Sequence, residues 1–319
     1  MPWSIADIPD QSGRVTVVTG ANGGLGLETA EALAGKGAHV VMAVRNQDKA
    51  AAAQSRILQN HPTASVELVS LDLGSQASIE AAADTITQKH PEIDLLVNNA
   101  GLMAMPERKT DDGYETQFGV NHLGHWTFTS RLLPSLLRAD AAGHDVRVVT
   151  VTSVARFMGT SVDPSNPHLH GKYSAWGSYG QAKLANYHFG LGLQRAFDDA
   201  GVGVQSLIAH PGLSHTDLQS HTQAEGGGGV IGAVSDKLAA AVGMSPADGA
   251  RMQLRAATDP DATGGELYGP LFASNGPAVK RPVLRRLGMD TAISTLWEVS
   301  ERETGVALDV AAAKADIGG

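Results

Sequence analysis

Residues 14–26 of the chain read RVTVVTGANGGLG, a β-branched apolar run that ends in a glycine-rich turn. The run predicts a buried strand, and the Ala, Leu and Glu residues that follow, up to about Lys36, predict a helix. Glycines at such a turn let the backbone approach a pyrophosphate closely, and the helix N-terminus offers it free N–H groups and a partial positive charge. The spacing is T-G-x3-G-x-G rather than G-x-G-x-x-G, and a glycine turn without a ligand is the alternative. The residues expected to bind phosphate are Gly20, Asn22, Gly23, Gly24, Leu25 and Gly26.

The same alternation of strand and helix continues along the chain. Further apolar runs occupy residues 38–44, 65–70, 93–97, 146–151, 202–211 and the region near 265–268, with helical segments between them. Runs that are apolar throughout are typical of parallel strands buried on both faces, and right-handed crossovers place helices on each side of the sheet. We expect an α/β fold, a doubly wound parallel sheet of the Rossmann type with about seven strands. We expect a single domain over residues 1–319, with its core at about 14–212 and a substrate lid and C-terminal extension at about 213–319.

Three segments depart from this alternation. Residues 156–176 contain Pro164, Pro167 and Gly171 and predict a long surface loop. Residues 213–246 include four consecutive glycines, Gly226–Gly229, and fit either a flexible linker or part of a substrate lid. Residues 280–286, KRPVLRR, are interpreted as a small basic surface patch.

Composition excludes several classes of protein. The 24 Lys and Arg residues against 33 Asp and Glu residues give a net charge of −9, which disfavours binding to nucleic acid. Apolar residues make up 42% of the chain and charged residues 18%, as in ordinary globular proteins. The absence of cysteine excludes disulfides, thiolate metal sites and a cysteine nucleophile.

The sequence predicts neither a membrane segment nor a metal site. No run approaches the roughly 20 apolar residues of a membrane span, and the N-terminus lacks a basic region followed by an apolar stretch. We therefore expect a cytoplasmic protein without a membrane anchor. The closest histidine pairs, His122/His125 and His168/His170, have no nearby carboxylate in a familiar ligand pattern, so no metal is expected.

Cofactor choice is predicted from the end of the second strand, Val44-Arg45. An NAD-binding unit usually carries an acid there for the ribose 2′-hydroxyl, whereas an arginine can pair with a 2′-phosphate. Arg45 therefore favours NADP(H) over NAD(H), with an ordinary surface arginine as the alternative. Asp72 follows the third strand and could accept from the adenine amino group. Asn98 and the residues after it follow the fourth strand, where open α/β sheets bind ligands, although such residues are often only turn formers.

Three residues form a candidate catalytic group. Ser153 ends the fifth strand, and Tyr179 and Lys183 are four residues apart in the next helix, so their side chains share one helical face. A cation beside a phenol favours the phenolate, so Lys183 is expected to lower the pKa of Tyr179 toward the working range. A Tyr-x3-Lys pair by itself is common on helix surfaces, and only the ordered set with the glycine turn and Ser153 is specific.

The chain resembles the short-chain dehydrogenase/reductase superfamily from about Arg14 to Gly305. The motifs that carry the resemblance are TGANGGLG (19–26), Asp72, NNAG (98–101), Asn121, Ser153, YGQAK (179–183) and HPG (210–212). VRN (44–46), NHLGHW (121–126), YSAWGSYGQAKLAN (173–186) and LWEVSERETGV (296–306) are similar to the retinol dehydrogenase-like group and its bacterial relatives. Ala182 stands where many members have Ser, and Gly23 stands where many have Ser or Thr. Little effect is expected from either difference.

The resemblance implies an NADP(H)-dependent carbonyl reductase or alcohol dehydrogenase. It implies that Tyr179 gives a proton to the carbonyl oxygen, that Ser153 hydrogen-bonds that oxygen, and that Lys183 holds the nicotinamide ribose. Asn121 would anchor a water in a proton relay through Lys183, and Thr216 would contact the nicotinamide carboxamide. Further contacts to the cofactor are implied for Leu73, Asn99, Ala100, Gly101, Pro211 and Gly212.

Two other functions remain open from the sequence. A noncatalytic NADP(H)-binding redox sensor would keep the fold but would not need Ser153, Tyr179 and Lys183, and an enzyme of dehydration or epimerisation would usually carry a larger C-terminal domain. The substrate is expected to be a small-molecule carbonyl or alcohol. An apolar substrate is indicated by apolar residues that lie near the expected pocket in the sequence but could equally belong to the core: Met103, Met105, Phe157, Met158, Trp176 and Leu213. The separation of 26 residues from Ser153 to Tyr179 could obstruct the superfamily's usual helix-face dimer, so a monomer or a homodimer is expected.

Overall fold

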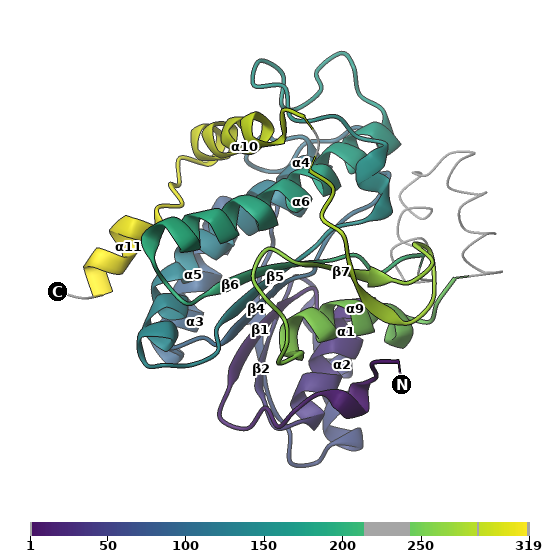
Figure 1. Cartoon of the computed structure of the whole chain (residues 1–319), viewed down its shortest axis with the longest axis vertical. Coiled ribbons are helices and arrows are strands. Elements are labelled where there is room, and N and C mark those ends of the chain that lie inside the picture. The colour runs from purple at the N-terminus through teal and green to yellow at the C-terminus, as the bar shows by residue number, and fades with distance from the viewer. Residues whose placement is uncertain (1, 214–242, 286, 318–319) are drawn as a thin grey trace.

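A computed structural model describes residues 2–213, 243–285 and 287–317 (Figure 1). Its strands form one sheet in the order β3-β2-β1-β4-β5-β6-β7-β8, with every neighbouring pair parallel except β7 and β8. The strand bounds are β1 Val15–Thr19, β2 His39–Val44, β3 Ser65–Ser70, β4 Leu95–Asn98, β5 Arg147–Val151, β6 Gln205–Ala209, β7 Leu267–Pro270 and β8 Ala278–Arg281. The predicted doubly wound parallel sheet is confirmed.

The sheet has one strand more than the sequence predicted. β8 begins just before the segment interpreted as a basic surface patch and pairs antiparallel with β7, with Tyr268 opposite Lys280. Lys280 also forms an ion pair with Glu266. Charged side chains are typical of edge strands because they discourage pairing with other chains. The same charges hide the strand from a search for apolar runs.

Helices cover both faces of the sheet (Figure 1). One core cluster joins inward residues such as Val18 and Val40 to α1 (Gly24–Gly35), α2 (Gln47–Asn60) and α9 (Pro246–Thr258). The other joins Val17 and Val41 to helices on the opposite face. Alternate residues of one strand point to opposite faces, so the central strands, which are covered on both faces, are largely apolar along their length. The helices of the second face are α3 (Gln76–Lys89), α5 (Gly124–Ala141), α6 (Ala175–Ala200), α10 (Met289–Thr304) and α11 (Val310–Ile317).

The sequence pattern predicts a helix over residues 121–137, before β5, but the helical segment starts earlier in the structure. The Glu115 carboxylate accepts hydrogen bonds from the N–H groups of Gln117 (2.8 Å) and Phe118 (2.7 Å) and so begins a helical turn, α4 (Thr116–Phe118). A π-helical segment, η2 (Gly119–Leu123), then leads into α5. Single π turns inside helices often mark functional sites. Here the π segment carries Asn121.

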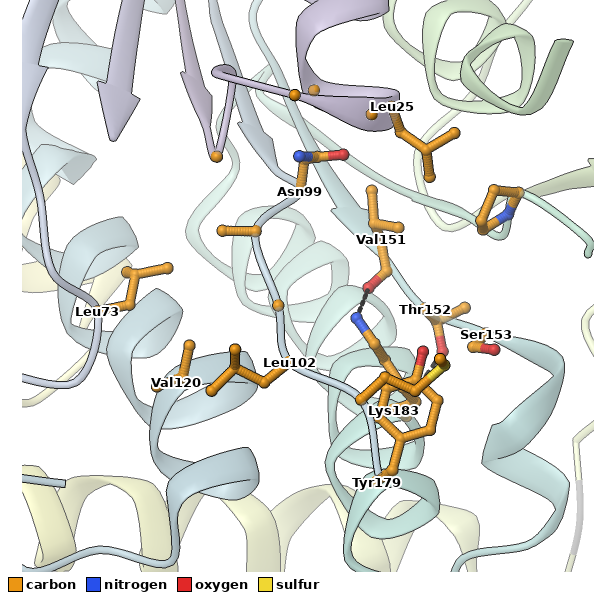
Figure 2. A pocket seen from close by; sticks show the side chains of 18 of the residues that line it. Leu25, Leu73, Asn99, Leu102, Val120, Val151, Thr152, Ser153, Tyr179 and Lys183 are labelled. Atoms are coloured by element: carbon orange, nitrogen blue, oxygen red, sulfur yellow. Dashed lines mark hydrogen bonds between the residues drawn. The ribbon is translucent and has the colours of Figure 1, made fainter. Parts of the chain in front are cut away.

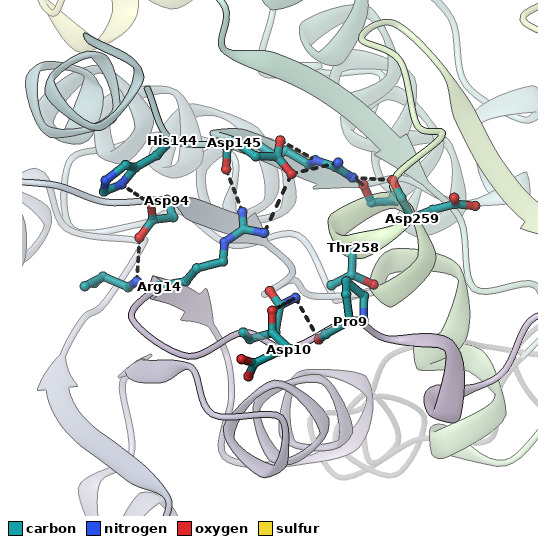
Figure 3. A network of polar contacts seen from close by, with 12 residues as sticks. Pro9, Asp10, Arg14, Asp94, His144, Asp145, Thr258 and Asp259 are labelled. Atoms are coloured by element: carbon teal, nitrogen blue, oxygen red, sulfur yellow. Dashed lines mark hydrogen bonds and ion pairs between the residues drawn. The ribbon is translucent and has the colours of Figure 1, made fainter. Parts of the chain in front are cut away.

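A polar network joins the amino ends of the central strands to α9 (Figure 3). The buried guanidinium of Arg147 pairs with both carboxylate oxygens of Asp145 and donates to the carbonyl oxygens of Ala256 (3.2 Å) and Asp259 (2.9 Å). Asp94 accepts from His144 Nδ1 at 2.7 Å and from the backbone N–H at the start of β1 at 2.6 Å. This network fixes the end of the sheet that lies opposite the strands' carboxyl ends.

The strand order reverses between β1 and β4, because chain segments before β4 lie on one side of β1 and later ones on the other. Adjacent connections leave the sheet on opposite faces at such a point, which opens a crevice beyond the carboxyl ends of the strands. Thr19, Asn98 and Val151 end the three strands that border it.

Candidate active site

A cavity of about 1040 Å³ lies beyond the carboxyl ends of β1, β2, β4 and β5 (Figure 2). The wall is formed by the glycine-rich turn, by the predicted catalytic group and by the residues after β2, β3 and β4. The sequence-predicted site residues that line it are Gly20, Asn22, Gly23, Gly24, Leu25, Gly26, Arg45, Asp72, Leu73, Asn99, Ala100, Gly101, Ser153, Tyr179, Lys183, Pro211 and Gly212. Residues separated by up to 192 positions in the sequence, from Gly20 to Gly212, therefore share one wall.

The glycine-rich turn leaves the start of α1 open toward this cavity. The N-cap residue, Gly23, makes no side-chain capping bond, and the first turn carries no acidic residue. The first N–H groups of a helix without a cap are available to an anion. Gly23 has φ −175°, an extended conformation that other residues also adopt, so its backbone does not require glycine.

Two of the glycines are needed for packing within the turn itself. Gly20 has φ +68°, a conformation that strains other residues. A Cβ on Gly26 would lie 2.3 Å from the Gly20 carbonyl oxygen and 2.6 Å from Asn99 Nδ2. These contacts allow α1 to begin directly against β1 and β4, so the turn holds its open shape.

A basic group lies at the other end of the cavity. Arg45 forms an ion pair with Asp72 at 3.8 Å, and both side chains are partly exposed. Asn46 and Lys49 also line the cavity there, and Asn46 caps α2 by accepting from the Lys49 N–H at 2.9 Å. Sequence reasoning missed Asn46 and Lys49. The N-cap pattern directly after Arg45 was the available signal.

The three candidate catalytic residues converge on the cavity from β5 and α6 (Figure 2). Tyr179 and the Ser153 side chain are hydrogen-bonded to each other. Lys183 Nζ lies 5.9 Å from the centre of the Tyr179 ring and donates to the Val151 carbonyl oxygen at 3.3 Å. The Lys183 carbonyl oxygen accepts from the Thr152 hydroxyl at 2.5 Å, which ties α6 to the end of β5.

The expected lowering of the Tyr179 pKa is wrong for the protein by itself. Burial raises the pKa of Tyr179 to about 12, against a smaller lowering by the hydrogen bond with Ser153. Burial also lowers the pKa of Lys183 to about 8. Both groups favour their neutral forms when water is excluded, and this effect outweighs the attraction of the ammonium for a phenolate. The phenol is thus protonated at neutral pH.

Asn121 does not line the cavity but holds part of its wall. Its side-chain amide accepts from the Leu102 N–H at 2.6 Å and donates to the Leu102 carbonyl oxygen at 2.9 Å. A Cβ added to Gly101 would lie 2.9 Å from Asn121 Oδ1 and 3.3 Å from Lys183 Nζ. Gly101 therefore lets the segment after β4 pass between Asn121 and Lys183, and both bonding groups of the Asn121 amide are used by the backbone.

The structure adds a buried hydrogen-bond network that sequence reasoning missed. The Thr19 hydroxyl accepts from the N–H groups of Asn99 (2.9 Å) and Ala100 (3.0 Å), and lies 2.9 Å from His125 Nε2. His125 Nδ1 lies 2.9 Å from the Asn121 carbonyl oxygen. Because that carbonyl can only accept, Nδ1 carries the imidazole proton and Nε2 accepts from Thr19.

This network joins the glycine turn to the π segment through one neutral histidine. Burial, together with a smaller effect of the charge on Lys183, lowers the pKa of His125 to about 4. The signal in the sequence was a histidine four residues after Asn121, the spacing at which a side chain reaches back to a carbonyl on the same helix face. From the sequence, His125 is considered only as a possible metal ligand beside His122, with no metal expected there, and no other role is assigned to it.

The apolar residues singled out from the sequence divide into two groups. Met103, Met158, Trp176 and Leu213 line the cavity. Met105 is 4% exposed and belongs to the core, whereas Phe157 is 51% exposed and does not line the cavity. Thr216 and Gly226–Gly229 lie outside the described residues.

Comparison with known proteins agrees with this geometry. A sequence model of short chain dehydrogenases matches residues 14–226, which include the glycine turn and the Ser153, Tyr179 and Lys183 group. The chain belongs to the short-chain dehydrogenase family. It is an oxidoreductase of a family that uses nicotinamide cofactors.

Several members of this family resemble the chain over most of its length. It is 36% identical to a short-chain dehydrogenase/reductase from Armillaria gallica, over 93% of this chain and 92% of that protein. It is 38% identical to a polyprenol dehydrogenase from Mus musculus, over 81% of this chain and 75% of that protein. A crystal structure of a protein from Mycobacterium paratuberculosis has a TM-score of 0.76 and 36% identity, covering 97% of this chain and 99% of that one.

Across the described ranges, no helix has the length and apolar character needed to cross a membrane.

Proposed function

We propose that the protein is an NADP(H)-dependent oxidoreductase that interconverts a ketone or aldehyde and an alcohol. The observation that carries the proposal is that a protonated phenol, a serine hydroxyl and a buried lysine meet in the same cavity as an uncapped helix N-terminus. The first three suit proton transfer to a carbonyl oxygen, and the last suits a pyrophosphate.

The residues present fit a nicotinamide dinucleotide. The open start of α1 suits its pyrophosphate, and Arg45 and Lys49 suit a 2′-phosphate, since no acid follows β2 directly. Asp72 suits the adenine end, and Asn99 to Gly101 follow the wall between the two ends. Pro211 and Gly212 border the cavity near Ser153, and Thr216 is the candidate for the carboxamide. The bound cofactor supplies or accepts the hydride.

The protein's own residues handle the proton. Tyr179 donates its phenolic proton to the carbonyl oxygen, and Ser153 donates a hydrogen bond to the same oxygen as negative charge develops on it. Lys183 binds the ribose and, as an ammonium, stabilises the phenolate that remains. Asn121 and His125 hold the segment after β4 and the π turn in place, so these groups keep their spacing.

The wall nearest Tyr179 favours an apolar substrate. The Trp176 ring lies 6.1 Å from the Tyr179 ring, centre to centre. Met103, Met158 and Leu213 also line the cavity, and methionine side chains adapt to ligands of varied shape. The similarity to a polyprenol dehydrogenase supports a long apolar alcohol or its carbonyl as the substrate class. We further propose that the whole chain acts as one domain, with the residues after Gly212 completing the substrate side.

The test is loss of NADPH absorbance with the purified protein against aldehydes and ketones graded from short and polar to long and apolar, with NADH in parallel. Turnover of long apolar carbonyls with a preference for NADPH is the expected result. Tight NADPH binding with no turnover of any carbonyl would instead favour a redox sensor.

A further inference from the structure

A second cluster of polar side chains lies at the other end of the sheet. His39 is the first residue of β2, and it pairs in register with Ser65, the first residue of β3. Glu67 is two residues further along β3, so it points to the same face as Ser65. His90 follows the last residue of α3, the helix that packs on this face. Arg45 and the cavity lie at the opposite end of β2.

The three side chains bring three potential ligand atoms together. The imidazole nitrogens of His39 and His90 and a carboxylate oxygen of Glu67 all lie within 4.8 Å of one another. Glu67 Oε2 is 3.1 Å from His90 Nε2 and 3.7 Å from His39 Nε2. Ligand atoms around a tetrahedral metal ion with bonds of about 2.0–2.2 Å are separated by about 3.3 Å. Small side-chain rotations suffice to reach that arrangement.

His39 is oriented as a metal ligand. Its Nδ1 lies 2.7 Å from the Ser65 hydroxyl, while its Nε2 is buried and has no hydrogen-bond partner. When Nδ1 donates its proton to Ser65, the bare lone pair of Nε2 faces a carboxylate oxygen. Histidine ligands typically donate their second ring N–H to an oxygen in this way, which fixes the ring orientation. In that tautomer, a cation between His39 Nε2 and Glu67 Oε2, which are 3.7 Å apart, would bind to both.

The charges of the cluster also suit a metal. Hydrogen bonds and charges from Lys89 and His90 lower the pKa of Glu67 despite partial burial, so it is a carboxylate at neutral pH. Burial and the neighbouring His90 lower the pKa of His39, which is therefore neutral. Neutral imidazole and ionised carboxylate are the forms that bind metals. Lys89 contacts the other carboxylate oxygen, Oε1, and leaves Oε2 for a ligand role.

We propose that His39 Nε2, Glu67 Oε2 and His90 Nε2 bind one divalent ion of the zinc class. Two imidazoles and a carboxylate suit Zn²⁺ better than Mg²⁺ or Ca²⁺, and water completes the coordination. The ion would join β2, the edge strand β3 and the end of α3. Its role is to hold the edge of the sheet, because it lies away from the candidate active site.

The first experiment titrates Zn²⁺ into chelator-treated full-length protein by calorimetry. We expect one ion per chain, and a midpoint of thermal unfolding raised by about 4 °C at a zinc concentration a hundred times the Kd. Co²⁺ should bind with the visible absorption of a four-coordinate site. Absence of binding to the wild-type protein would overturn the proposal.

Variants separate this site from chance binding. His90→Ala and Glu67→Gln should each weaken Zn²⁺ binding at least tenfold, whereas His170→Ala, an exposed histidine outside the cluster, should leave it unchanged. Glu67→Gln keeps the size of the side chain and guards against a folding defect. NADPH binding at the other end of the sheet should stay within twofold of wild type in all three. Equal Zn²⁺ affinity in wild type and Glu67→Gln would contradict the proposal.

Discussion

Burial brings the pKa of Lys183 close to neutral pH. Its pKa of about 8 is well below the ordinary lysine value of 10.5, so it is charged below pH 8 and neutral above. We predict that kcat/KM for carbonyl reduction falls as the pH rises through about 8, because the phenolate left on Tyr179 then loses its neighbouring cation. In Lys183→Arg this limb should move above pH 10, since a guanidinium stays protonated. An unchanged limb in the variant would show that another group titrates.

Thr19 satisfies three buried groups with one hydroxyl. Thr19→Val has nearly the same shape but leaves the Ala100 N–H and the imidazole of His125 without this partner, while the Asn99 N–H keeps the Val97 carbonyl oxygen at 3.0 Å. We predict a loss of about 3 kcal/mol in the free energy of unfolding, measured in urea, because unpaired buried polar groups cost about 1–3 kcal/mol each. Thr19→Ser keeps the hydroxyl and should lose much less. Equal stability of the two variants would contradict this role.

At the scale of elements, apolar patterning was enough to find β1 to β7, but it did not locate α9 between β6 and β7. It could not find β8, whose Lys280 and Arg281 are charged because the strand is an edge. Nor could it find the true start of the helix at Asn121, because Glu115 acts there as an N-cap outside the usual Ser, Thr, Asp and Asn. The misses of β8 and of this helix start concern charged residues, which a search for apolar periodicity does not register.

We propose that the choice between NADP(H) and NAD(H) is made just before α2, at Arg45. Arg45→Ala should weaken NADPH binding about tenfold and leave NADH binding unchanged, because a charge-assisted hydrogen bond contributes about 1.5 kcal/mol or more. The matched control is Arg56→Ala, within α2, whose guanidinium pairs with Glu28 and Glu31 instead. The measurement is the Kd for both cofactors by fluorescence titration. An equal loss for NADH would refute the assignment of Arg45 to the 2′-phosphate.

On the scale of the whole molecule, Arg147 ties the sheet to α9 from within the interior. Arg147→Met keeps most of the apolar length of the side chain but removes the paired bonds to Asp145. It also leaves the carbonyl oxygens of Ala256 and Asp259 without the guanidinium as donor. We predict a loss of about 3 kcal/mol in the free energy of unfolding, with the Kd for NADPH unchanged. Arg138→Met, at an exposed position, is the control. Similar denaturation midpoints for the two would count against the network of Figure 3.

The gathering of distant residues into one cavity was foreseeable because parallel strands deliver their carboxyl ends to the same edge. The electrostatic state of that cavity was not. Proximity of Lys183 to Tyr179 suggested a lowered phenol pKa, but the depth of burial, which reverses the direction, depends on packing from elements far away in the chain. The same limit applies to His125, whose partners Thr19 and Asn121 come from different elements.

We propose that Tyr179 is the proton donor in a cavity that binds NADP(H). The most direct test of this proposal compares wild type and Tyr179→Phe for NADPH binding and for carbonyl reduction under identical conditions. We predict an NADPH Kd within about twofold of wild type and a kcat lowered by at least a hundredfold, the usual scale of general acid catalysis. A variant that reduces the same carbonyl at an undiminished rate would contradict the account.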